Sequence, residues 1–465
     1  MNTKKQATLG HAFIPIIVLM VVLSVSILVF GADPHIPLLV ASIVAAFVAI
    51  FGLGYTWEEV EKGAIETIQL SMQAILILMI IGTLIGAWIL SGTVPAMIYY
   101  GLQILSPSIF LIATLVICSI VSLATGTSWG TAGTIGVALM GVGQGLGIPA
   151  PIVAGCIVSG AYFGDKMSPL SDTTNLAPAM AGSTLFEHIG YMVYTTGPTY
   201  LICLVLYGLI GAKYAGSSLD TGSIDMILNA IAGNFNITPL LLLPPVIVIV
   251  LIALKIPAIP GLLSGTVLGG IFAVIFQGST LGDIVDATHY GVTVETGVEL
   301  VDDLLSGGGL DGMMWTVSLI LLAMVFGGIM ERTGMLQAIG NAILKFAVNT
   351  GSLVTATILT SLAVNILAAD QYLAIVIPGR MYKSVYEERG LEPRLLSRTL
   401  EDAGTLTSAL IPWNTCGAFM HTALGISPMQ FAPYAFLNFL NPIVAIVLAF
   451  TGIGIKQDKS KIAKS

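Results

Sequence analysis

The chain has 465 residues, of which 56% are hydrophobic and only 9% are charged, against about 25% charged residues in an ordinary soluble domain. Its 25 acidic and 17 basic residues give a formal net charge of -8. This composition excludes a string of soluble domains, and the scarcity of Lys and Arg excludes a nucleic-acid-binding protein. The apolar residues come in blocks of about 15 to 20, the length that crosses a bilayer. We therefore predict an all-α polytopic membrane protein.

Ten apolar segments are predicted to be membrane spans. They cover residues 13–30, 36–54, 72–90, 150–163, 189–211, 238–254, 259–277, 313–330, 403–424 and 432–453. Lys4 and Lys5 precede the first segment and no small-residue cleavage site follows it, so we interpret it as an uncleaved span rather than a signal peptide. The four cysteines lie far apart in apolar segments and are expected to be packing residues.

Two further apolar segments, about 108–139 and 352–382, are interrupted near their middles. The interruptions are Thr125-Gly126-Thr127-Ser128 and Ala368-Ala369-Asp370-Gln371. Backbone breaks at membrane depth are tolerated only inside protein or beside a water-filled cavity. Each segment is therefore predicted to be a re-entrant helical hairpin with the break at its tip. The glycine-rich residues 141–147 are predicted to form a loop after the first hairpin.

The order of these features repeats along the chain. At a constant offset of 242 residues, Gly92 falls on Gly334 and Ser128 falls on Asp370, tip on tip. We predict a first repeat over residues 1–212, a connecting segment over 213–237, a second repeat over 238–455 and a basic cytoplasmic tail over 456–465. Each repeat would contain about five spans and one hairpin.

The distribution of charge predicts that the two repeats are inverted. The segment after the second hairpin carries Arg380, Lys383, Arg389, Arg394 and Arg398, whereas residues 140–150 carry no charge. Short basic loops stay cytoplasmic, so these two loops lie on opposite sides of the membrane. Residues 278–312 contain acidic residues and no Lys or Arg, which suits the outside. The lysines near both termini suit the cytoplasm.

Two polar segments beside or within predicted spans are candidates for ion chemistry. The first runs from Gly164 to Asn175 and the second from Glu401 to Thr415. Charged side chains in a membrane are costly and mark functional sites by default. Hydroxyl, amide and carboxylate oxygens are hard ligands that suit Na⁺. A buried carboxylate also takes up a proton more readily than a solvated one, which gives a physical basis for exchange.

We predict that Na⁺ binds between the hairpin tips and these two broken segments. Asp165 and Asp172 are the expected main acids, with Asp370 and Asp402 as their second-half counterparts. The expected neutral ligands are Thr127, Ser128, Ser168, Thr173, Thr174, Asn175, Thr405, Asn414 and Thr415. Among these, Asp165, Asp172, Asn175 and Asn414 are the predicted direct Na⁺ ligands. No cofactor is expected.

Structural interpretations of the same residues stay open. Asp165 could neutralise Lys166 or cap a helix. Glu401 and Asp402 could be first-turn acids that complement a helix dipole. Glu331 and Arg332 could form an interfacial pair at the end of a span.

The segment from Gly164 to Pro178, GDKMSPLSDTTNLAP, resembles the NhaC family of Na⁺/H⁺ antiporters within the ion transporter superfamily. TGTSWGT at 125–131 and IPWNT at 411–415 share this resemblance. The same family contains Na⁺-malate/H⁺-lactate antiporters. The resemblance implies inverted repeats with re-entrant hairpins. It also implies a homodimer whose transport domains move as elevators against scaffold domains.

The resemblance also bears on the substrate. Carboxylate transporters of this superfamily carry two Ser-Asn-Thr signatures, whose nearest matches here are 173–175 and 413–415, both incomplete. The acidic residues favour cation handling instead, although Lys166 could pair with an organic anion. The sequence therefore predicts a transporter, not an enzyme, that exchanges Na⁺ for H⁺ across a bacterial-type plasma membrane. The alternative is a malate-Na⁺/lactate-H⁺ antiporter.

An intramembrane hydrolase is the third hypothesis. Gly126-Thr127-Ser128-Trp129-Gly130 fits the GxSxG pattern of a nucleophilic serine. That motif requires a strand before it and a helix after it, whereas here it lies within a membrane segment.

Overall fold

The computed structural model describes residues 4–214 and 221–455, which form helices and no sheet beyond one isolated bridge between Val292 and Gly307. Eight helices are long and apolar enough to cross a membrane, or up to ten if two bent helix pairs each count as one span. These findings confirm the prediction of an all-α polytopic membrane protein. The predicted tail, 456–465, lies outside the described residues.

Up to Asn234, the described residues 4–214 and 221–234 form eleven α-helices and two π-helical turns, η1 and η2. They are α1 (Leu9–Phe30), α2 (His35–Phe47), η1 (Val48–Gly52), α3 (Trp57–Leu90), α4 (Thr93–Ile104), α5 (Pro107–Thr125), α6 (Ser128–Thr131), η2 (Ala132–Gly136), α7 (Val137–Gly145), α8 (Ala150–Met167), α9 (Asp172–Ala181), α10 (Leu185–Tyr214) and α11 (Thr221–Asn234).

The second half, which the structure describes as far as residue 455, adds thirteen α-helices, two π-helical turns (η4 and η6) and three short 3₁₀ turns. They are η3 (Pro239–Leu242), α12 (Leu243–Ala253), α13 (Ala258–Phe272), η4 (Ala273–Gln277), α14 (Leu281–Tyr290), α15 (Glu299–Leu305), η5 (Asp311–Met313), α16 (Met314–Arg332), α17 (Met335–Leu344), α18 (Thr350–Leu367), α19 (Leu373–Glu388), α20 (Pro393–Leu400), η6 (Glu401–Thr405), α21 (Leu406–Ser408), α22 (Thr415–Leu424), α23 (Pro428–Phe431), η7 (Ala432–Tyr434) and α24 (Phe436–Thr451).

The helical breaks lie where polar and small residues interrupt the apolar segments. Helix α5 ends at Gly126, which has a positive φ of 73°, and Thr127 caps α6 by accepting a hydrogen bond from the Gly130 amide at 3.2 Å. The second break, between α18 and α19, contains Ala369, a non-glycine residue with a φ of 55°. Whether these segments form re-entrant hairpins stays a prediction, because α5 and α18 are each long enough to span the membrane.

The connecting segment over 213–237 stays a prediction, and the part of it that the structure describes contains helix α11. Two other local predictions are wrong. Residues 141–145 belong to α7 rather than to a loop, because their glycines are close-packing positions: a Cβ on Gly143 would lie 2.6 Å from a methyl group of Val153. Helix α3 begins 15 residues before position 72, at Trp57 (72 − 57), because Thr56 and Glu59 form a capping box there.

The element boundaries recur along the chain. Helix α4 begins at Thr93 and α17 at Met335, an offset of 242 (335 − 93), and each follows a glycine with positive φ, Gly92 or Gly334. Helices α9 and α22 begin 243 residues apart (415 − 172), and each ends at a left-handed glycine. This correspondence supports the predicted repeat, while the inverted orientation of the repeats stays a prediction.

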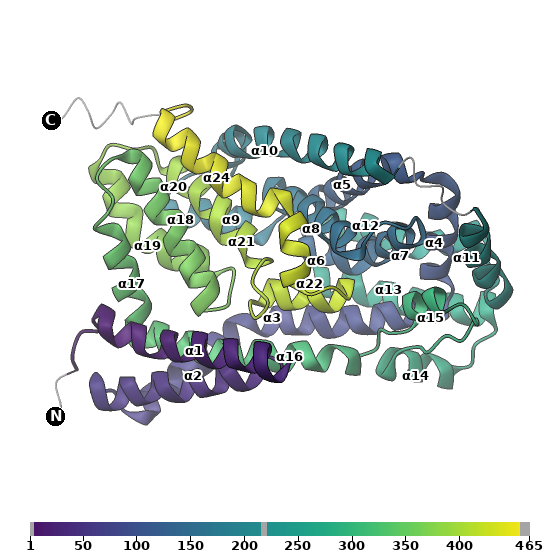
Figure 1. Cartoon of the computed structure of the whole chain (residues 1–465), viewed down its shortest axis with the longest axis horizontal. Coiled ribbons are helices and arrows are strands. Elements are labelled where there is room, and N and C mark those ends of the chain that lie inside the picture. Colours follow the sequence, from purple (N-terminus) through teal and green to yellow (C-terminus); the bar gives the residue numbers. More distant parts are fainter. Residues whose placement is uncertain (1–3, 215–220, 456–465) are drawn as a thin grey trace.

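The two ends of the molecule are built from different segments. Helix α1 begins and α24 ends at the same end, on the left of Figure 1, together with α17, α19 and α20. Helices α11, α14 and α15 lie at the opposite end. There α14 and the loop before α16 pack closely against α3: the Gly309 amide donates to the Gly82 carbonyl at 2.8 Å, and a Cβ on Gly86 would overlap the carbonyl of Ala287 in α14.

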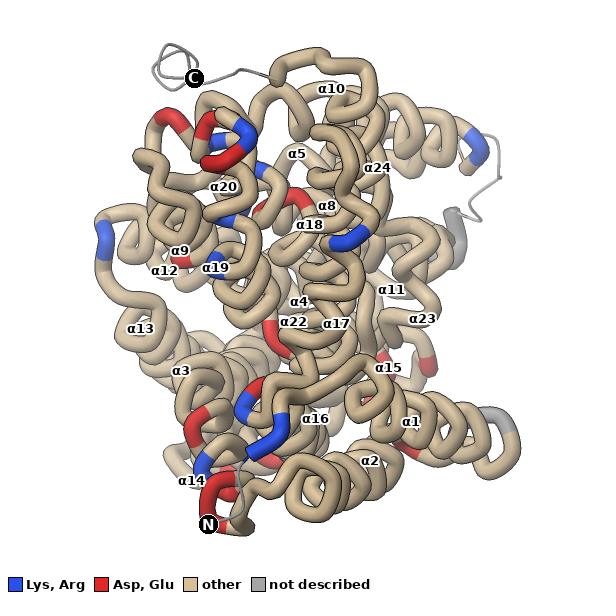
Figure 2. Tube along the Cα trace, turned by 90° about the vertical axis from the view of Figure 1, so that its left-hand side faces the viewer, with Lys and Arg blue, Asp and Glu red and all other residues tan. Residues whose placement is uncertain are grey.

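The outer surface of the described chain is largely apolar. Charged residues form separate patches on an otherwise uncharged trace (Figure 2). Large hydrophobic side chains on α1, α10, α13 and α24 are exposed, as Leu201, Val267 and Phe450 illustrate. A soluble protein rarely exposes apolar surface on this scale, so these faces suit contact with lipid.

Candidate functional site

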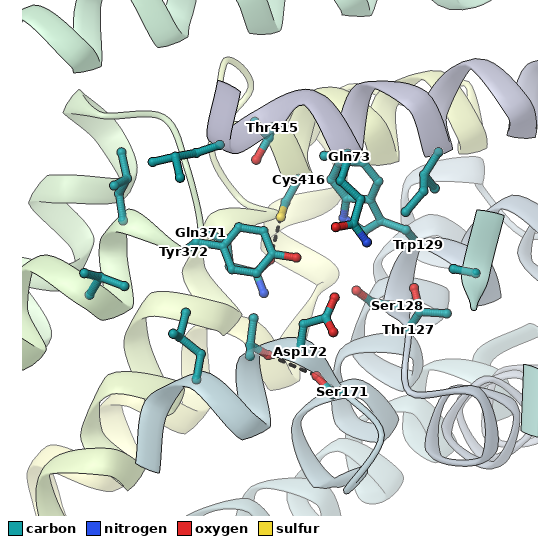
Figure 3. A pocket seen from close by; sticks show the side chains of 18 of the residues that line it. Gln73, Thr127, Ser128, Trp129, Ser171, Asp172, Gln371, Tyr372, Thr415 and Cys416 are labelled. Atoms are coloured by element: carbon teal, nitrogen blue, oxygen red, sulfur yellow. Dashed lines mark hydrogen bonds between the residues drawn. The ribbon is translucent and has the colours of Figure 1, made fainter. Parts of the chain in front are cut away.

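One large cavity, of about 1310 Å³, lies at the helical breaks. Four of the helices that start at a break have their first residue on its wall: Ser128 of α6, Asp172 of α9, Leu373 of α19 and Thr415 of α22. Helix α3 supplies a further wall, and Figure 3 shows Gln73 projecting toward the same space. The breaks of both halves therefore meet at one cavity.

Asp165 is held at the edge of this cavity by three hydrogen bonds. Its Oδ2 accepts from the Ser128 hydroxyl at 2.6 Å and the Ser128 amide at 3.2 Å, and its Oδ1 accepts from the Ser171 hydroxyl at 2.6 Å. An ionised carboxylate has about four acceptor positions. One position therefore stays free for a cation, on a side chain that is oriented by residues of both the α5–α6 break and the α8–α9 break.

Asp172 contributes a second carboxylate to the same cavity. It is the first residue of α9, because Ser168 to Ser171 interrupt the helix after α8 ends at Met167. The Asp172 side chain is exposed and points into the space between Ser128 and Tyr372 (Figure 3). Two acids with different degrees of burial thus share one chamber.

Six of the predicted site residues line the cavity, and they are Thr127, Ser128, Asp165, Asp172, Thr173 and Thr415. Others lie away from its wall and support the backbone at the breaks. Ser168 donates to the Leu123 carbonyl at 2.8 Å, and Thr174 donates to the Lys166 carbonyl at 2.9 Å. The Asn175 amide group donates to the Pro169 and Ser171 carbonyls at 3.0 and 2.8 Å. Their predicted role in binding stays a prediction.

The second-half residues Asp370 and Asn414 are buried behind the cavity wall. Asp370 accepts from the Leu373 amide at 3.0 Å at the start of α19. Asn414 accepts from the Cys416 amide at 3.0 Å, and its amide group donates to the Asn365 side-chain oxygen at 3.0 Å. These contacts fix the backbone at the start of α19 and at the start of α22.

Asp402 lies in a buried cluster of charges that has no part in the cavity wall. Its Oδ1 accepts from Lys166 Nζ at 2.6 Å, from Thr195 at 2.9 Å and from Asn441 at 2.6 Å. Arg398 Nε lies 3.6 Å from the other carboxylate oxygen. Lys166 therefore pairs with Asp402 rather than with its neighbour Asp165. Thr405, one helical turn along from Asp402, is also buried away from the cavity.

Several cavity residues were missed from the sequence. Gln69 and Gln73 lie four residues apart on α3, a spacing that places both on one face of a helix, and this polar pair in an apolar span was a usable signal. Gln371, Tyr372 and Cys416 also line the cavity, and the Cys416 thiol donates to Gln371 at 2.6 Å.

The sequence suggested that Arg332 pairs with its neighbour Glu331 at the end of α16, but Arg332 pairs with a residue of α3 instead. Arg332 lies 3.6 Å from Glu66 of α3, and both residues line the cavity together with Glu331. The contact between α16 and α3 was not visible in the local sequence.

Comparison with known proteins shows to which family the chain belongs. Residues 160–453 match the model of the Na⁺/H⁺ antiporter family. The chain belongs to this family. Its relatives include the Na⁺/H⁺ antiporter NhaC of Alkalihalophilus pseudofirmus, which is 40% identical over 98% of each chain.

Two further relatives of this Na⁺/H⁺ antiporter family member are named for other transport activities. The malate-2H⁺/Na⁺-lactate antiporter of Bacillus subtilis is 38% identical over 99% of each chain. The arginine/ornithine antiporter ArcD of Halobacterium salinarum is 39% identical over 97% of this chain and 93% of its own. The resemblance seen in the sequence is confirmed, as is the prediction of a transporter rather than an enzyme.

Proposed function

We propose that the protein is a secondary active transporter that exchanges Na⁺ for H⁺ across the plasma membrane. The observation that carries this proposal is the position of Asp165, oriented by Ser128 and Ser171 at the edge of a cavity that also exposes Asp172. Na⁺ needs several hard oxygens, and this chamber offers two carboxylates with the hydroxyls of Thr127 and Ser128 beside them.

Competition between Na⁺ and H⁺ for these acids gives the exchange. A protonated carboxyl group is a weaker cation ligand than a carboxylate, so proton uptake in the cavity releases Na⁺. Deprotonation on the other side of the membrane restores the ligand. The coupling is thermodynamic linkage between two ligands of one site, and it requires no nucleotide.

The basic residues around the cavity favour an inward-facing state. Lys255, Arg332 and Arg380 line the cavity, and α19, which carries Arg380, lies at the end of the molecule where α1 begins and α24 ends (Figure 1). Segments rich in Lys and Arg stay cytoplasmic. We therefore place this end, with both termini, in the cytoplasm and the loop that contains α14 and α15 outside.

The test uses purified protein in liposomes with a trapped pH-sensitive dye and an imposed Na⁺ gradient. Wild-type protein is expected to move protons when Na⁺ alone is present. Asp165→Asn and Asp172→Asn each remove a charge at nearly constant volume and are expected to abolish this movement while the protein stays folded. Asp303→Asn is the matched control, because Asp303 is exposed on α15. Undiminished exchange by either cavity variant would remove that residue from the mechanism.

Exchange of an organic acid is the second candidate function. The cavity volume of about 1310 Å³ exceeds the roughly 300–1,000 Å³ of ordinary small-molecule sites. Four helices begin at its wall, and helix N-termini favour anionic groups. In the same liposomes, proton movement that appears only with malate outside and lactate inside would favour this function over simple Na⁺/H⁺ exchange.

A further inference from the structure

Gln73 places an amide group in the middle of a membrane helix. Helix α3 has 34 residues, of which 16 precede Gln73 (73 − 57) and 17 follow it (90 − 73). The hydrocarbon core of a bilayer takes up about 20 helical residues. Every placement of that core within α3, from residues 57–76 to residues 71–90, therefore includes Gln73. A polar group at this depth is costly unless it has a hydrogen-bonding partner.

The protein itself supplies no such partner for Gln73. The hydroxyl of Thr67, on the same helix, donates to a carbonyl of its own helix at 3.0 Å, and the amide of Asn365 donates to a carbonyl of η6 at 2.8 Å. Within residues 4–214 and 221–455, no hydrogen bond joins the Gln73 side chain to another group. Because Gln73 lines the cavity, its partner is a species inside the cavity.

Gln73 is also the last polar residue of a stripe along α3. Glu66, Gln69 and Gln73 follow one another at intervals of three and four residues, which places them on one face of the helix, and all three line the cavity. The next cavity residue on this face is the apolar Ile77, and no later residue of α3, all of which the structure describes, belongs to the wall. The polar path along α3 therefore ends at Gln73.

Oxygen atoms from three other segments share the space in front of Gln73. The side chains of Ser128, Asp172 and Tyr372 project into the same part of the cavity as Gln73 (Figure 3). They come from the α5–α6, α8–α9 and α18–α19 breaks, respectively. A cation that prefers oxygen ligands takes several of them, arranged around it. Gln73 offers one from α3, the side of the cavity that faces these breaks.

We propose that Gln73 is a Na⁺ ligand and that its side-chain oxygen completes the coordination of the ion from α3. The inference rests on the proposed Na⁺/H⁺ exchange and names a specificity-determining residue for it. An amide oxygen is neutral, so it adds a ligand without adding charge to the two acids. Larger cations take more oxygen ligands, as Ca²⁺ takes more than Mg²⁺. The Gln73 oxygen therefore favours Na⁺ over the smaller Li⁺.

The liposome measurement tests this proposal when Na⁺ and Li⁺ are compared. Gln73→Leu removes the oxygen and introduces a residue that suits a membrane helix, so the variant is expected to fold. Its apparent KM for Na⁺ should rise at least about tenfold, as when a supporting group of a metal site is lost, with the maximal rate near that of the wild type. The KM for Li⁺ should rise less. Gln73→Glu keeps an oxygen at the same reach and should retain a lower KM for Na⁺ than Gln73→Leu.

Gln337→Leu is the matched control. It makes the same chemical change at an exposed position of α17 that has no part in the cavity wall, so both KM values should stay unchanged. If Gln73→Leu does not fold, Gln73→Met replaces it in the same comparison.

The outcomes separate this inference from the proposed function. Wild-type protein that moves no protons with either ion would overturn the function itself. An unchanged KM for Na⁺ in Gln73→Leu, or equal losses for Na⁺ and Li⁺, would overturn Gln73 as a ligand and leave the function standing. Equal losses are the result expected if Gln73 only hydrates the cavity or supports the packing of α3.

Discussion

Individual residues illustrate what the sequence reveals about a membrane site. The acids Asp165 and Asp172 were identified because charge is rare in apolar spans, and both line the cavity. The partner of Lys166 was not identifiable, because it lies 236 positions away in the chain, at Asp402. Arg398, expected in a cytoplasmic loop, is buried in α20 with its guanidinium 4.6 Å from the Tyr191 ring. Such pairings depend on which face each helix turns inward.

The Lys166–Asp402 pair gives a prediction for stability. Lys166→Met removes one partner of a buried ion pair and should destabilise the protein by about 3–5 kcal/mol. The double variant Lys166→Met/Asp402→Asn should recover part of that loss. Thermal unfolding in detergent provides the measurement. Lys62→Met is the control, because Lys62 is exposed and 3.9 Å from Glu66. If Lys166→Met unfolds at the same temperature as the wild-type protein, the ion pair contributes little to stability.

At the scale of elements, helix breaks were more predictable than helix packing. The break before Ser128 and the one after Met167 coincide with glycine, proline and polar residues that disfavour a continuous helix in an apolar segment. The glycines of α7 have the same composition as a loop, yet they permit close contact with neighbouring helices. Composition alone does not distinguish these two uses of glycine.

The contact between α3 and α14 gives a prediction at this scale. Gly86→Ala would place a methyl group against the Ala287 carbonyl oxygen of α14. Overpacking of this kind costs about 1–3 kcal/mol, so the melting temperature in detergent should fall. Gly190→Ala on α10 is the matched control, because a methyl group at that position would meet no atom within 4 Å. Equal melting temperatures for the two variants would indicate that α14 shifts without a measurable loss of stability.

For the whole molecule, composition and span length predicted the polytopic helical architecture, since a bilayer imposes both. The cavity was only partly predictable. Its wall on α3 and the contact of Arg332 with Glu66 join segments that are far apart in sequence. The homodimer, the scaffold and transport domains and the elevator movement stay predictions from the family resemblance.

The proposed inward-facing state predicts access from one side. Gln73→Cys, made in a Cys416→Ser background, places a single thiol in the cavity. A membrane-impermeant thiol reagent should label it in inside-out vesicles and leave it unlabelled in right-side-out vesicles. Asp303→Cys on α15 should show the opposite pattern. If the cavity thiol reacts only from outside, the assignment of the basic end to the cytoplasm is wrong.

The ring stack at the break between α5 and α6 has a spectroscopic consequence. Trp129 adjoins Ser128, lines the cavity and stacks on Phe419 of α22, with ring centroids 4.3 Å apart and planes 7° apart. Movement of α6 relative to α22, or a change in the field at Asp165, would alter the environment of this indole. In a variant whose other four tryptophans are replaced, its fluorescence is expected to report ion binding, so that occupancy becomes measurable in detergent without any transport across a membrane.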